Sequence, residues 1–275
     1  MLGGGGVTGI AWETGMIAGL AERGIDLAAA DAVIGTSAGA VVGADIACGR
    51  QAEALYQAQL APPDPGPAAR IGWGLSGRLM WLMGTSRNPV RARARIGRWA
   101  LAAHTMPEAD RRTVFQARLP ASDWPATLLK VTAVDARTGE FVVFDSAGDT
   151  GLVDAVAASC AVPGIWPPVT IGARRYIDGG VRSVANADLA AGYQRVVIVA
   201  PVAAGIGHMA SPRRQAAALA AAGSRVVLVQ PDRAAARAIG HNVLDSSRRA
   251  AAARAGRAQA AAEAAAVGAV WLAGR

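Results

Sequence analysis

Cysteine, histidine and lysine are all scarce in this chain of 275 residues. Its two cysteines, Cys48 and Cys160, exclude a disulfide framework and are typical of a reducing compartment. No apolar run is long enough to span a membrane, and the stretch 196–206 is interrupted by Pro201. No basic segment followed by an apolar stretch opens the chain, so no secretory signal is evident. We therefore expect a soluble cytoplasmic protein, and peripheral contact with a membrane stays open.

Acidic residues are fewer than basic ones, which leaves a formal net charge of +8. Lys130 is the only lysine, so 27 of the 28 basic side chains are arginines. They cluster in two groups, one at Arg87, Arg91, Arg93, Arg95 and Arg98 and the other at Arg248, Arg249, Arg254 and Arg257. No helix-turn-helix, zinc-finger or aromatic RNA-binding signature accompanies them, so we expect no nucleic-acid partner. Solvated helix faces are the favoured interpretation, and contact with an anionic membrane surface is the second.

Short β-branched runs alternate with helical stretches, a pattern typical of an α/β fold with a largely parallel sheet. At this length we expect one domain over residues 1–275. The predicted strands are Ala32–Ile34, Leu128–Val134, Phe141–Phe144, Val196–Ala200 and Val226–Val229, and the predicted helices include Gly9–Arg23, Ala38–Ala47, Gly151–Cys160 and Ser246–Val267. The turn at 136–139 predicts an antiparallel hairpin between the second and third strands.

The region from about 61 to 120 differs in composition from the rest of the chain. It opens with a proline-rich linker at 61–67, followed at 73–84 by tryptophan, leucine and methionine residues broken by glycines. Two interpretations stay open. The segment is either a helical insertion packed on the core, or a mobile cap whose apolar side faces an acyl chain or a lipid surface.

The segment Gly35-Thr36-Ser37-Ala38-Gly39 follows a predicted strand and leads into a predicted helix. In that context the pattern G-x-S-x-G indicates a nucleophile elbow, a sharp turn that holds its serine in a strained backbone conformation. Glycines on both sides remove the Cβ atoms that would clash there. The pattern alone is weak, because glycine and serine are common, so its interpretation depends on the other motifs of the chain.

A run of four glycines at 3–6 stands just ahead of the first predicted helix. Bare backbone N–H groups at a helix N-terminus bind anions, which leaves two candidates: a pyrophosphate or the oxyanion of an acyl-transfer intermediate. A dinucleotide site needs a strand before the glycines, and only Met1 and Leu2 precede them. We favour the oxyanion, with Gly4, Gly5 and Gly6 as donors, because it also accounts for the serine elbow that follows.

A serine nucleophile needs a base, and two types of base are available. A histidine triad would combine Ser37 and Asp178 with His208 or His241, but α/β-hydrolases build several strands before their elbow and this chain does not. The simpler base is Asp178 itself, which ends a short apolar run and enters the turn Asp178-Gly179-Gly180. An upstream segment, Ala158-Ser159 with Pro163, adds a further motif at a plausible distance.

Together these four motifs resemble the patatin-like phospholipase family, over about two thirds of the chain. The family pattern is a loop G-G-G-x-[KR]-G, the elbow G-x-S-x-G, a segment A-S-x-x-x-P and a turn D-G-[GA], in that order. The matching segments are Gly4-Gly5-Gly6-Val7-Thr8-Gly9, Gly35 to Gly39, Ala158 to Pro163 and Asp178-Gly179-Gly180.

The resemblance implies a three-layer fold, a mostly parallel central sheet flanked by helices, with a cap-like helical insertion. It assigns Ser37 as nucleophile and Asp178 as base of a Ser-Asp dyad, without a metal or cofactor. The glycine loop becomes the oxyanion hole, with supporting roles for Gly9, Gly35, Gly39, Ser159, Pro163, Gly179 and Gly180. The implied substrate is a lipid acyl ester. Its headgroup, its acyl length, transfer to an alcohol instead of water, and the oligomeric state stay open.

Two positions depart from the family pattern. Thr8 stands where the loop usually carries a basic residue, and the strand that feeds the loop is reduced to Met1 and Leu2. We expect either a start site upstream of Met1 or a truncated first strand. These departures keep a second hypothesis open, a catalytically silent lipid-binding relative. A nucleotide-binding α/β domain is the least favoured third.

Overall fold

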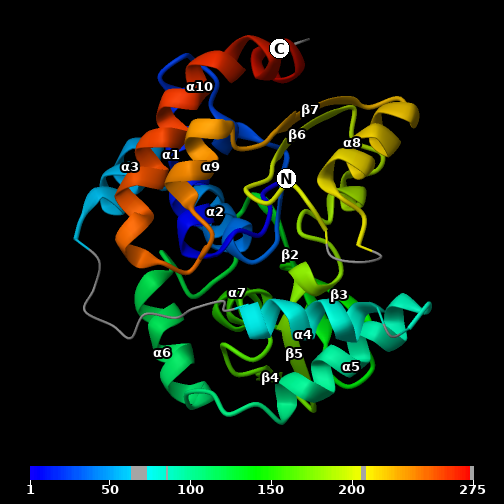
Figure 1. Ribbon diagram of the computed structural model, residues 1–275. Helices are drawn as coiled ribbons and strands as arrows, with labels where there is room; N and C mark the ends of the chain where they lie inside the picture. The colour runs from blue at the N-terminus through cyan, green and yellow to red at the C-terminus, as the bar shows by residue number, and fades with distance from the viewer. Residues whose placement is uncertain (63–72, 85, 206–208, 273–275) are drawn as a thin grey trace.

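The computed structural model describes residues 1–62, 73–84, 86–205 and 209–272. Its helices are α1 (Gly6–Ala21), α2 (Ala38–Ala47), α3 (Ala52–Leu60), α4 (Trp73–Gly84), α5 (Pro89–Leu101), α6 (Glu108–Arg118), α7 (Leu152–Ser159), α8 (Pro212–Ala221), α9 (Arg233–Ile239) and α10 (Arg249–Trp271). Its strands are β1 (Ala32–Gly35), β2 (Leu128–Asp135), β3 (Phe141–Phe144), β4 (Val169–Ile171), β5 (Arg174–Asp178), β6 (Arg195–Val199) and β7 (Arg225–Val229). Figure 1 shows helices on both sides of β6 and β7, with α8 on one side and α9 and α10 on the other. The fold is therefore α/β with a central sheet, as predicted.

The sheet is parallel in one part and antiparallel in the other. β1 pairs with β2, and β6 with β7, in parallel, and Leu2 joins the two pairs by parallel bridges to Gly35 and Val199. The pairs β2–β3, β2–β5 and β4–β5 are antiparallel. Short connections explain the antiparallel pairs β2–β3 and β4–β5, because a parallel pair needs a crossover of about a dozen residues. The predicted hairpin after β2 is confirmed, whereas the sheet is less parallel than expected.

Alternating side chains of the parallel strands enter two different cores. Val33 of β1 packs in the core formed with α1, α2 and α10, while the adjacent Ile34 packs with residues of β6 and α8. β6 follows the same rule, since Val197 faces the first core and Ile198 the second. A sheet covered by helices on both faces requires this pattern. It produces the three-layer arrangement.

Helices α1 and α10 pack closely through glycine. A Cβ atom added to Gly15 of α1 would lie 2.0 Å from the carbonyl oxygen of Ala253, and one on Gly256 of α10 would lie 2.2 Å from that of Trp12. α10 runs past Gly268, beyond its predicted end, and continues to Trp271. Val267 is fully buried and Trp271 packs against the core, and these contacts outweigh the cost of about 1 kcal/mol for a helical glycine. None of the described helices is long and apolar enough to cross a membrane.

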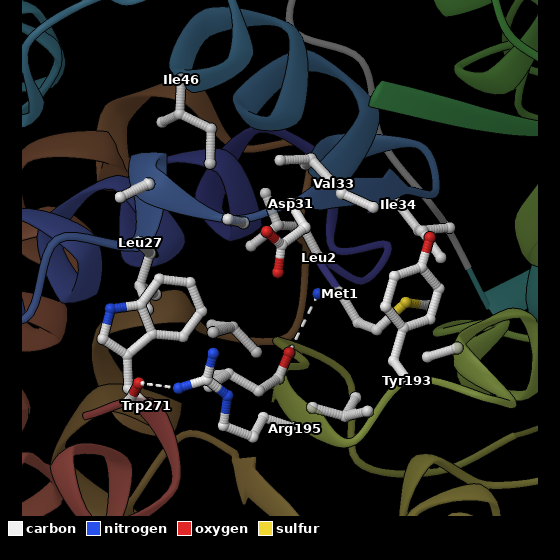
Figure 2. A pocket seen from close by; sticks show the side chains of 17 residues that line it. Met1, Leu2, Leu27, Asp31, Val33, Ile34, Ile46, Tyr193, Arg195 and Trp271 are labelled. Carbon is white, nitrogen blue, oxygen red and sulfur yellow. Dashed lines mark hydrogen bonds between the residues drawn. The ribbon is translucent and has the colours of Figure 1, made fainter. Parts of the chain in front are cut away.

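The first two residues lie between β1 and β6 and position the glycine run. The Leu2 N–H donates to the Ile34 carbonyl at 2.9 Å, and the Met1 nitrogen donates to the Val197 carbonyl at 2.9 Å (Figure 2). Next to them is a cavity of about 80 Å³, which Figure 2 shows from close by. It is lined by none of the residues expected to carry chemistry.

The region expected to be helical contains α4, α5 and α6, which Figure 1 shows together at one end of the molecule. Leu82 and Met83 of α4 are buried against Ile96 of α5 and residues of β2 and β5. Met80 and Trp81 on the same helix are exposed, at 60% and 65%. Most of the linker, at 63–67, lies outside the described residues. The segment thus has both a packed face and an exposed apolar face.

Candidate active site

Ser37 occupies a sharp turn between β1 and α2. Its backbone is strained, with φ 52° and ψ −113°, and the side chain is 8% exposed. Gly39 must lack a side chain, since a Cβ atom there would lie 2.1 Å from the Leu2 carbonyl oxygen. The Ser37 N–H donates to Ser159 Oγ at 2.9 Å, and Cys160 Sγ donates to the Ser37 carbonyl at 3.2 Å. These contacts hold the elbow from both sides and place Ser159 in the supporting position expected of it.

Asp178 ends β5 and begins the short 3₁₀ helix Gly179–Val181. Its Oδ1 accepts a hydrogen bond from the Gly180 N–H at 2.7 Å, and its own N–H donates to the Ala161 carbonyl at 3.0 Å. Burial raises the pKa of Asp178 to about 6, while side-chain hydrogen bonding from Ser37 and the Gly180 N–H act in the opposite direction. The carboxyl group therefore titrates close to neutral pH, where a general base is effective.

The register of β2 brings the elbow and the acid together. β1 runs parallel to β2 and ends at Gly35, opposite Val131. β5 runs antiparallel to β2 and ends at Asp178, opposite Ala133, two residues further along. Two segments that are distant in sequence thus end beside the same short stretch of one strand.

Asn186 is a residue of this site that the sequence interpretation missed. It is fully buried, with φ 48°, and its Nδ2 donates to Thr36 Oγ1 at 3.0 Å, to Thr132 Oγ1 at 3.4 Å, to the Gly179 carbonyl at 3.2 Å and to the Ser183 carbonyl at 2.8 Å. Thr36 precedes Ser37 and Gly179 follows Asp178. One amide group therefore links both motifs. The signal that could have revealed it is a single amide side chain in the apolar run 184–187.

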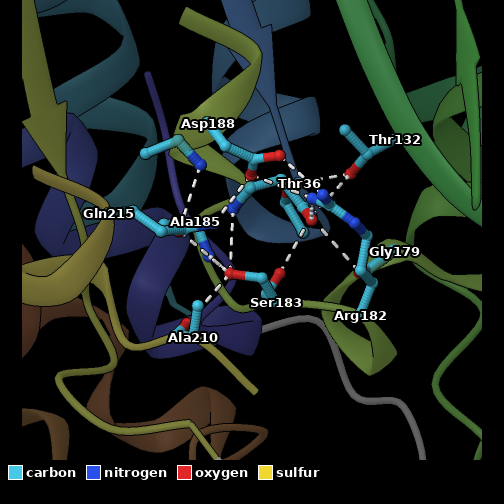
Figure 3. A network of polar contacts seen from close by, with 11 residues as sticks. Thr36, Thr132, Gly179, Arg182, Ser183, Ala185, Asp188, Ala210 and Gln215 are labelled. Carbon is cyan, nitrogen blue, oxygen red and sulfur yellow. Dashed lines mark hydrogen bonds and ion pairs between the residues drawn. The ribbon is translucent and has the colours of Figure 1, made fainter. Parts of the chain in front are cut away.

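A wider polar network surrounds this amide, as Figure 3 shows. The hydroxyls of Thr36 and Thr132 lie 2.8 Å apart, and Ser183 Oγ lies 3.1 Å from Gln215 Oε1. Gln215 in turn donates to Asp188 Oδ1 at 2.7 Å. Buried polar groups that are mutually satisfied in this way favour one geometry. The network fixes the backbone on which both candidate catalytic side chains stand.

The glycine loop supplies fewer free donors than expected. The Gly4 N–H donates to the Val184 carbonyl at 2.7 Å, which corrects the expectation that Gly4 is an oxyanion donor. In the part of the chain that the structure describes, no hydrogen bond engages the N–H groups of Gly5, Gly6 or Ala38. Ala38 follows the serine, where nucleophile elbows usually contribute a donor. The available donors thus come from the loop and from the N-terminus of α2.

The other loop positions are structural. Gly6 has φ 60°, and a Cβ atom on it would lie 2.6 Å from the Val243 carbonyl oxygen. Thr8, which replaces the basic residue of the family pattern, is fully buried. Its Oγ1 and N–H both point to that same carbonyl, at 3.3 and 3.0 Å. Thr8 therefore supports the loop. An added Cβ atom would also lie less than 3.0 Å from a neighbour at Gly5, Gly35, Gly179 and Gly180, and 3.3 Å from the Pro201 side chain at Gly9.

Residues 1–191 match the family model described as patatin-like phospholipase, more than two thirds of the chain. This chain belongs to the patatin-like phospholipase family. The matched range contains the glycine loop, Ser37, Asp178 and Asn186. The family comprises lipid acyl hydrolases, which fits a site built around a serine elbow.

Two solved structures are similar to this chain at low identity. VipD from Legionella pneumophila is 16% identical with a TM-score of 0.37, over 64% of this chain and 44% of that one. The type III effector protein ExoU is 20% identical with a TM-score of 0.38, over 96% of this chain and 52% of that one. The chain thus spans about half the length of these proteins. No curated protein matches the sequence significantly.

Two cavities meet at Ser37. One, of about 230 Å³, contains Asp178 and is lined mainly by apolar side chains, among them Leu79 and Met83 of α4. The other, of about 390 Å³, lies on the α6 side and contains three arginines. Ser37 lines both. An ester at the nucleophile could therefore extend into two different environments.

The described histidines lie away from the elbow. His104 and His241 are exposed, and neither lines a cavity that contains Ser37. His208 lies outside the described residues. Among the described residues, two ionisable groups interact with Ser37, the carboxyl of Asp178 and the buried thiol of Cys160, and of these Asp178 is the one whose pKa lies near neutral pH.

Proposed function

We propose that this protein is a serine lipid acyl hydrolase in which Ser37 and Asp178 form a catalytic dyad. The observation that carries the proposal is the buried Asp178 carboxyl, which interacts with the Ser37 side chain in a mainly apolar cavity. Membership of a family of lipid acyl hydrolases supports the reaction class. The dyad needs no histidine, in accordance with the exposed positions of His104 and His241.

The reaction would proceed by two acyl transfers. Ser37 Oγ attacks the ester carbonyl carbon while its proton passes to Asp178, and the carbonyl oxygen becomes an oxyanion. The N–H groups of Gly5, Gly6 and Ala38 would stabilise this charge. The C–O bond to the alcohol then breaks, and Asp178 returns the proton to the departing oxygen. A water molecule, deprotonated by Asp178, attacks the acyl-enzyme and releases the fatty acid and Ser37.

The donors have to supply much of the rate enhancement. A carboxylate with a pKa of about 6 is a weak base toward a hydroxyl group, although a stronger one than an ordinary Asp near 3.9. Losing one oxyanion donor in other hydrolases costs roughly 100- to 1000-fold in rate. The fixed loop described above is therefore as important to the proposal as the dyad.

The apolar cavity suits the acyl chain of a lipid. Its wall includes Leu79 and Met83 of α4, whose other face exposes Met80 and Trp81. Apolar side chains of this size at a surface insert readily into a lipid interface. We assign to α4 both a wall of the acyl site and a transient contact with the membrane that carries the substrate.

A fluorophosphonate probe tests the proposal, since it labels only activated serines. The wild-type protein should be labelled, and it should hydrolyse p-nitrophenyl butyrate. Ser37→Ala and Asp178→Asn should lose labelling and at least about 1000-fold of the hydrolysis rate. His241→Ala, His208→Ala and His104→Ala serve as controls and should retain both.

Two results would contradict the assignment. A histidine variant that is inactive while Asp178→Asn stays active would replace the dyad by a triad. A folded wild-type protein that neither reacts with the probe nor hydrolyses the ester would indicate the silent lipid-binding alternative.

A further inference from the structure

The two cavities at Ser37 differ in charge. Among the described residues, those that line the cavity on the α4 side include the carboxyl group of Asp178 and no basic side chain. The described residues that line the cavity on the α6 side include Arg111, Arg118 and Arg249 and no acidic side chain. The nucleophile therefore stands at a boundary between an apolar region and a cationic one.

Arg111 differs from the other two arginines of the cationic cavity. Arg118 pairs with both carboxylate oxygens of Asp45, at 2.9 and 3.3 Å. Arg249 donates to Gln59 Oε1 at 3.2 Å and to the Ala58 carbonyl at 2.9 Å. For Arg111, no carboxylate among the described residues lies within ion-pair distance, and its buried Nε has no hydrogen-bond partner there.

Aromatic rings hold the Arg111 guanidinium in place. Its central carbon lies 3.8 Å from the ring centre of Trp166 and 4.7 Å from that of Phe115. Stacking of this kind restrains the planar group and leaves its edge, which carries the N–H donors, free to bind an anion. Burial lowers the pKa of Arg111 from its ordinary value, the neighbouring Cys160 acts in the opposite direction, and no carboxylate of the described residues does so.

The cation–π contacts with Phe115 and Trp166 offset only part of the cost of burying the Arg111 charge. A methionine or leucine would fill the same space against Phe115 and Trp166 without the desolvation penalty of a buried cation. Retaining an uncompensated guanidinium beside the nucleophile is favourable when an anion occupies the cavity. The planar guanidinium can donate two parallel N–H hydrogen bonds to a phosphate or carboxylate group.

We propose that the cationic cavity is an anion-binding subsite, in which Arg111 recognises a phosphate group on the alcohol side of the ester. The proposal rests on the proposed function, since it assigns the acyl chain to the apolar cavity. Gly6, Ser37, Val162 and Leu244 line both cavities, so the ester carbonyl would lie where they meet. The phosphate would then extend toward α6.

A matched substrate pair tests the subsite: a 1-acylglycerol and the 1-acylglycerol 3-phosphate with the same acyl chain, which differ only in the phosphate. We expect the wild-type protein to favour the phosphate ester by about 10- to 100-fold in kcat/KM, the range of a charge-assisted hydrogen bond. In Arg111→Gln this ratio should fall toward one, through a higher KM for the phosphate ester. Arg111→Lys, which keeps the charge without the planar guanidinium, should retain part of the preference for the phosphate ester.

Arg112→Gln is the matched control. Arg112 is the next residue of α6, is exposed, pairs with Asp154 and does not line the cavity. Its variant should keep the wild-type ratio. A wild-type ratio near one would overturn the proposal, as would an Arg111→Gln variant that loses activity equally on both substrates, because that pattern indicates a merely structural arginine.

A binding measurement separates failure of the subsite from failure of the proposed hydrolysis. Dodecyl phosphate and inorganic phosphate are titrated calorimetrically into Ser37→Ala and into Ser37→Ala with Arg111→Gln. Binding of dodecyl phosphate that depends on Arg111 supports the subsite even if no ester is hydrolysed. Equal binding of inorganic phosphate would identify a free anion as the ligand, and binding of neither would refute the proposal.

Discussion

The side chain of Asn186 donates a hydrogen bond of 3.0 Å to the hydroxyl of Thr36, although the two residues are 150 positions apart. The same amide group also reaches the Gly179 carbonyl at 3.2 Å. It thus ties the residue before Ser37 to the residue after Asp178. The distance between the two candidate catalytic groups depends on a side chain that takes no part in proton transfer.

Replacing Asn186 should therefore reduce activity more than stability alone explains. Asn186→Ala leaves several buried acceptors without a donor, which we expect to cost about 1–3 kcal/mol of unfolding free energy. We expect kcat to fall more than tenfold in the protein that remains folded. Asn186→Gly is the matched variant, because it removes the amide but tolerates φ 48°. If either variant keeps full kcat, Asn186 does not position the dyad.

The pH dependence of activity should report Asp178. Only the ionised carboxylate can accept the Ser37 proton, and its pKa is raised to about 6. We expect kcat/KM for a neutral short-chain ester to rise tenfold per pH unit up to about pH 6 and then to level off. A rate profile between pH 4.5 and 8 measures this limb. A rise in kcat/KM centred near pH 4 would mean that burial does not raise the pKa of Asp178 in the working enzyme.

The same shift predicts that Asp178 destabilises the fold at neutral pH. Below about pH 3.8 the group is protonated in both folded and unfolded states, so it has no effect on stability. Above about pH 6 the folded protein holds a buried charge, at a cost on the order of 2–3 kcal/mol. Asp178→Asn should therefore be more stable than the wild type at pH 8, and the difference should shrink toward pH 4.

Urea unfolding of both proteins at the two pH values measures this effect. Glu13, a fully buried carboxyl whose pKa burial also raises, is present in both proteins, so its contribution cancels in the comparison. A stability difference that is the same at pH 4 and pH 8 would contradict the raised pKa of Asp178.

The glycine loop offers a test of the oxyanion donors. Gly6→Ala places a side chain at φ 60° and 2.6 Å from the Val243 carbonyl oxygen, so the loop must shift. We expect kcat to fall by roughly 100-fold. Gly49→Ala is the control, since Gly49 has φ 79° with nothing within 4 Å of the added Cβ. It should lose about 1–2 kcal/mol of stability and keep its kcat. Equal activity in the two variants would remove the loop from the oxyanion hole.

Several motifs and strands of this protein could be predicted from the sequence, because local residue preferences determine them. The elbow at Ser37, the glycine run, the turn at Asp178 and strands β1, β2, β3, β6 and β7 are each set by residues that are close together in the chain. Glycine and β-branched residues act through their own backbone preferences, so such motifs can be recognised in the sequence without knowledge of the tertiary structure. The family and the two proposed catalytic residues follow from these motifs.

Contacts between distant segments were decided only by the tertiary structure. The antiparallel half of the sheet depends on how β2 and β4 pair with β5, and the engagement of the Gly4 N–H by Val184 and the place of Asn186 depend on how the segment after Asp178 packs against the elbow and the glycine loop. The environment of Arg111 is likewise invisible in a chain with 27 arginines, because only packing shows that this guanidinium is stacked on aromatic rings and has no carboxylate near it among the described residues. The sequence by itself determined which groups could react, and the fold decided which are close enough, free enough and buried enough to do so.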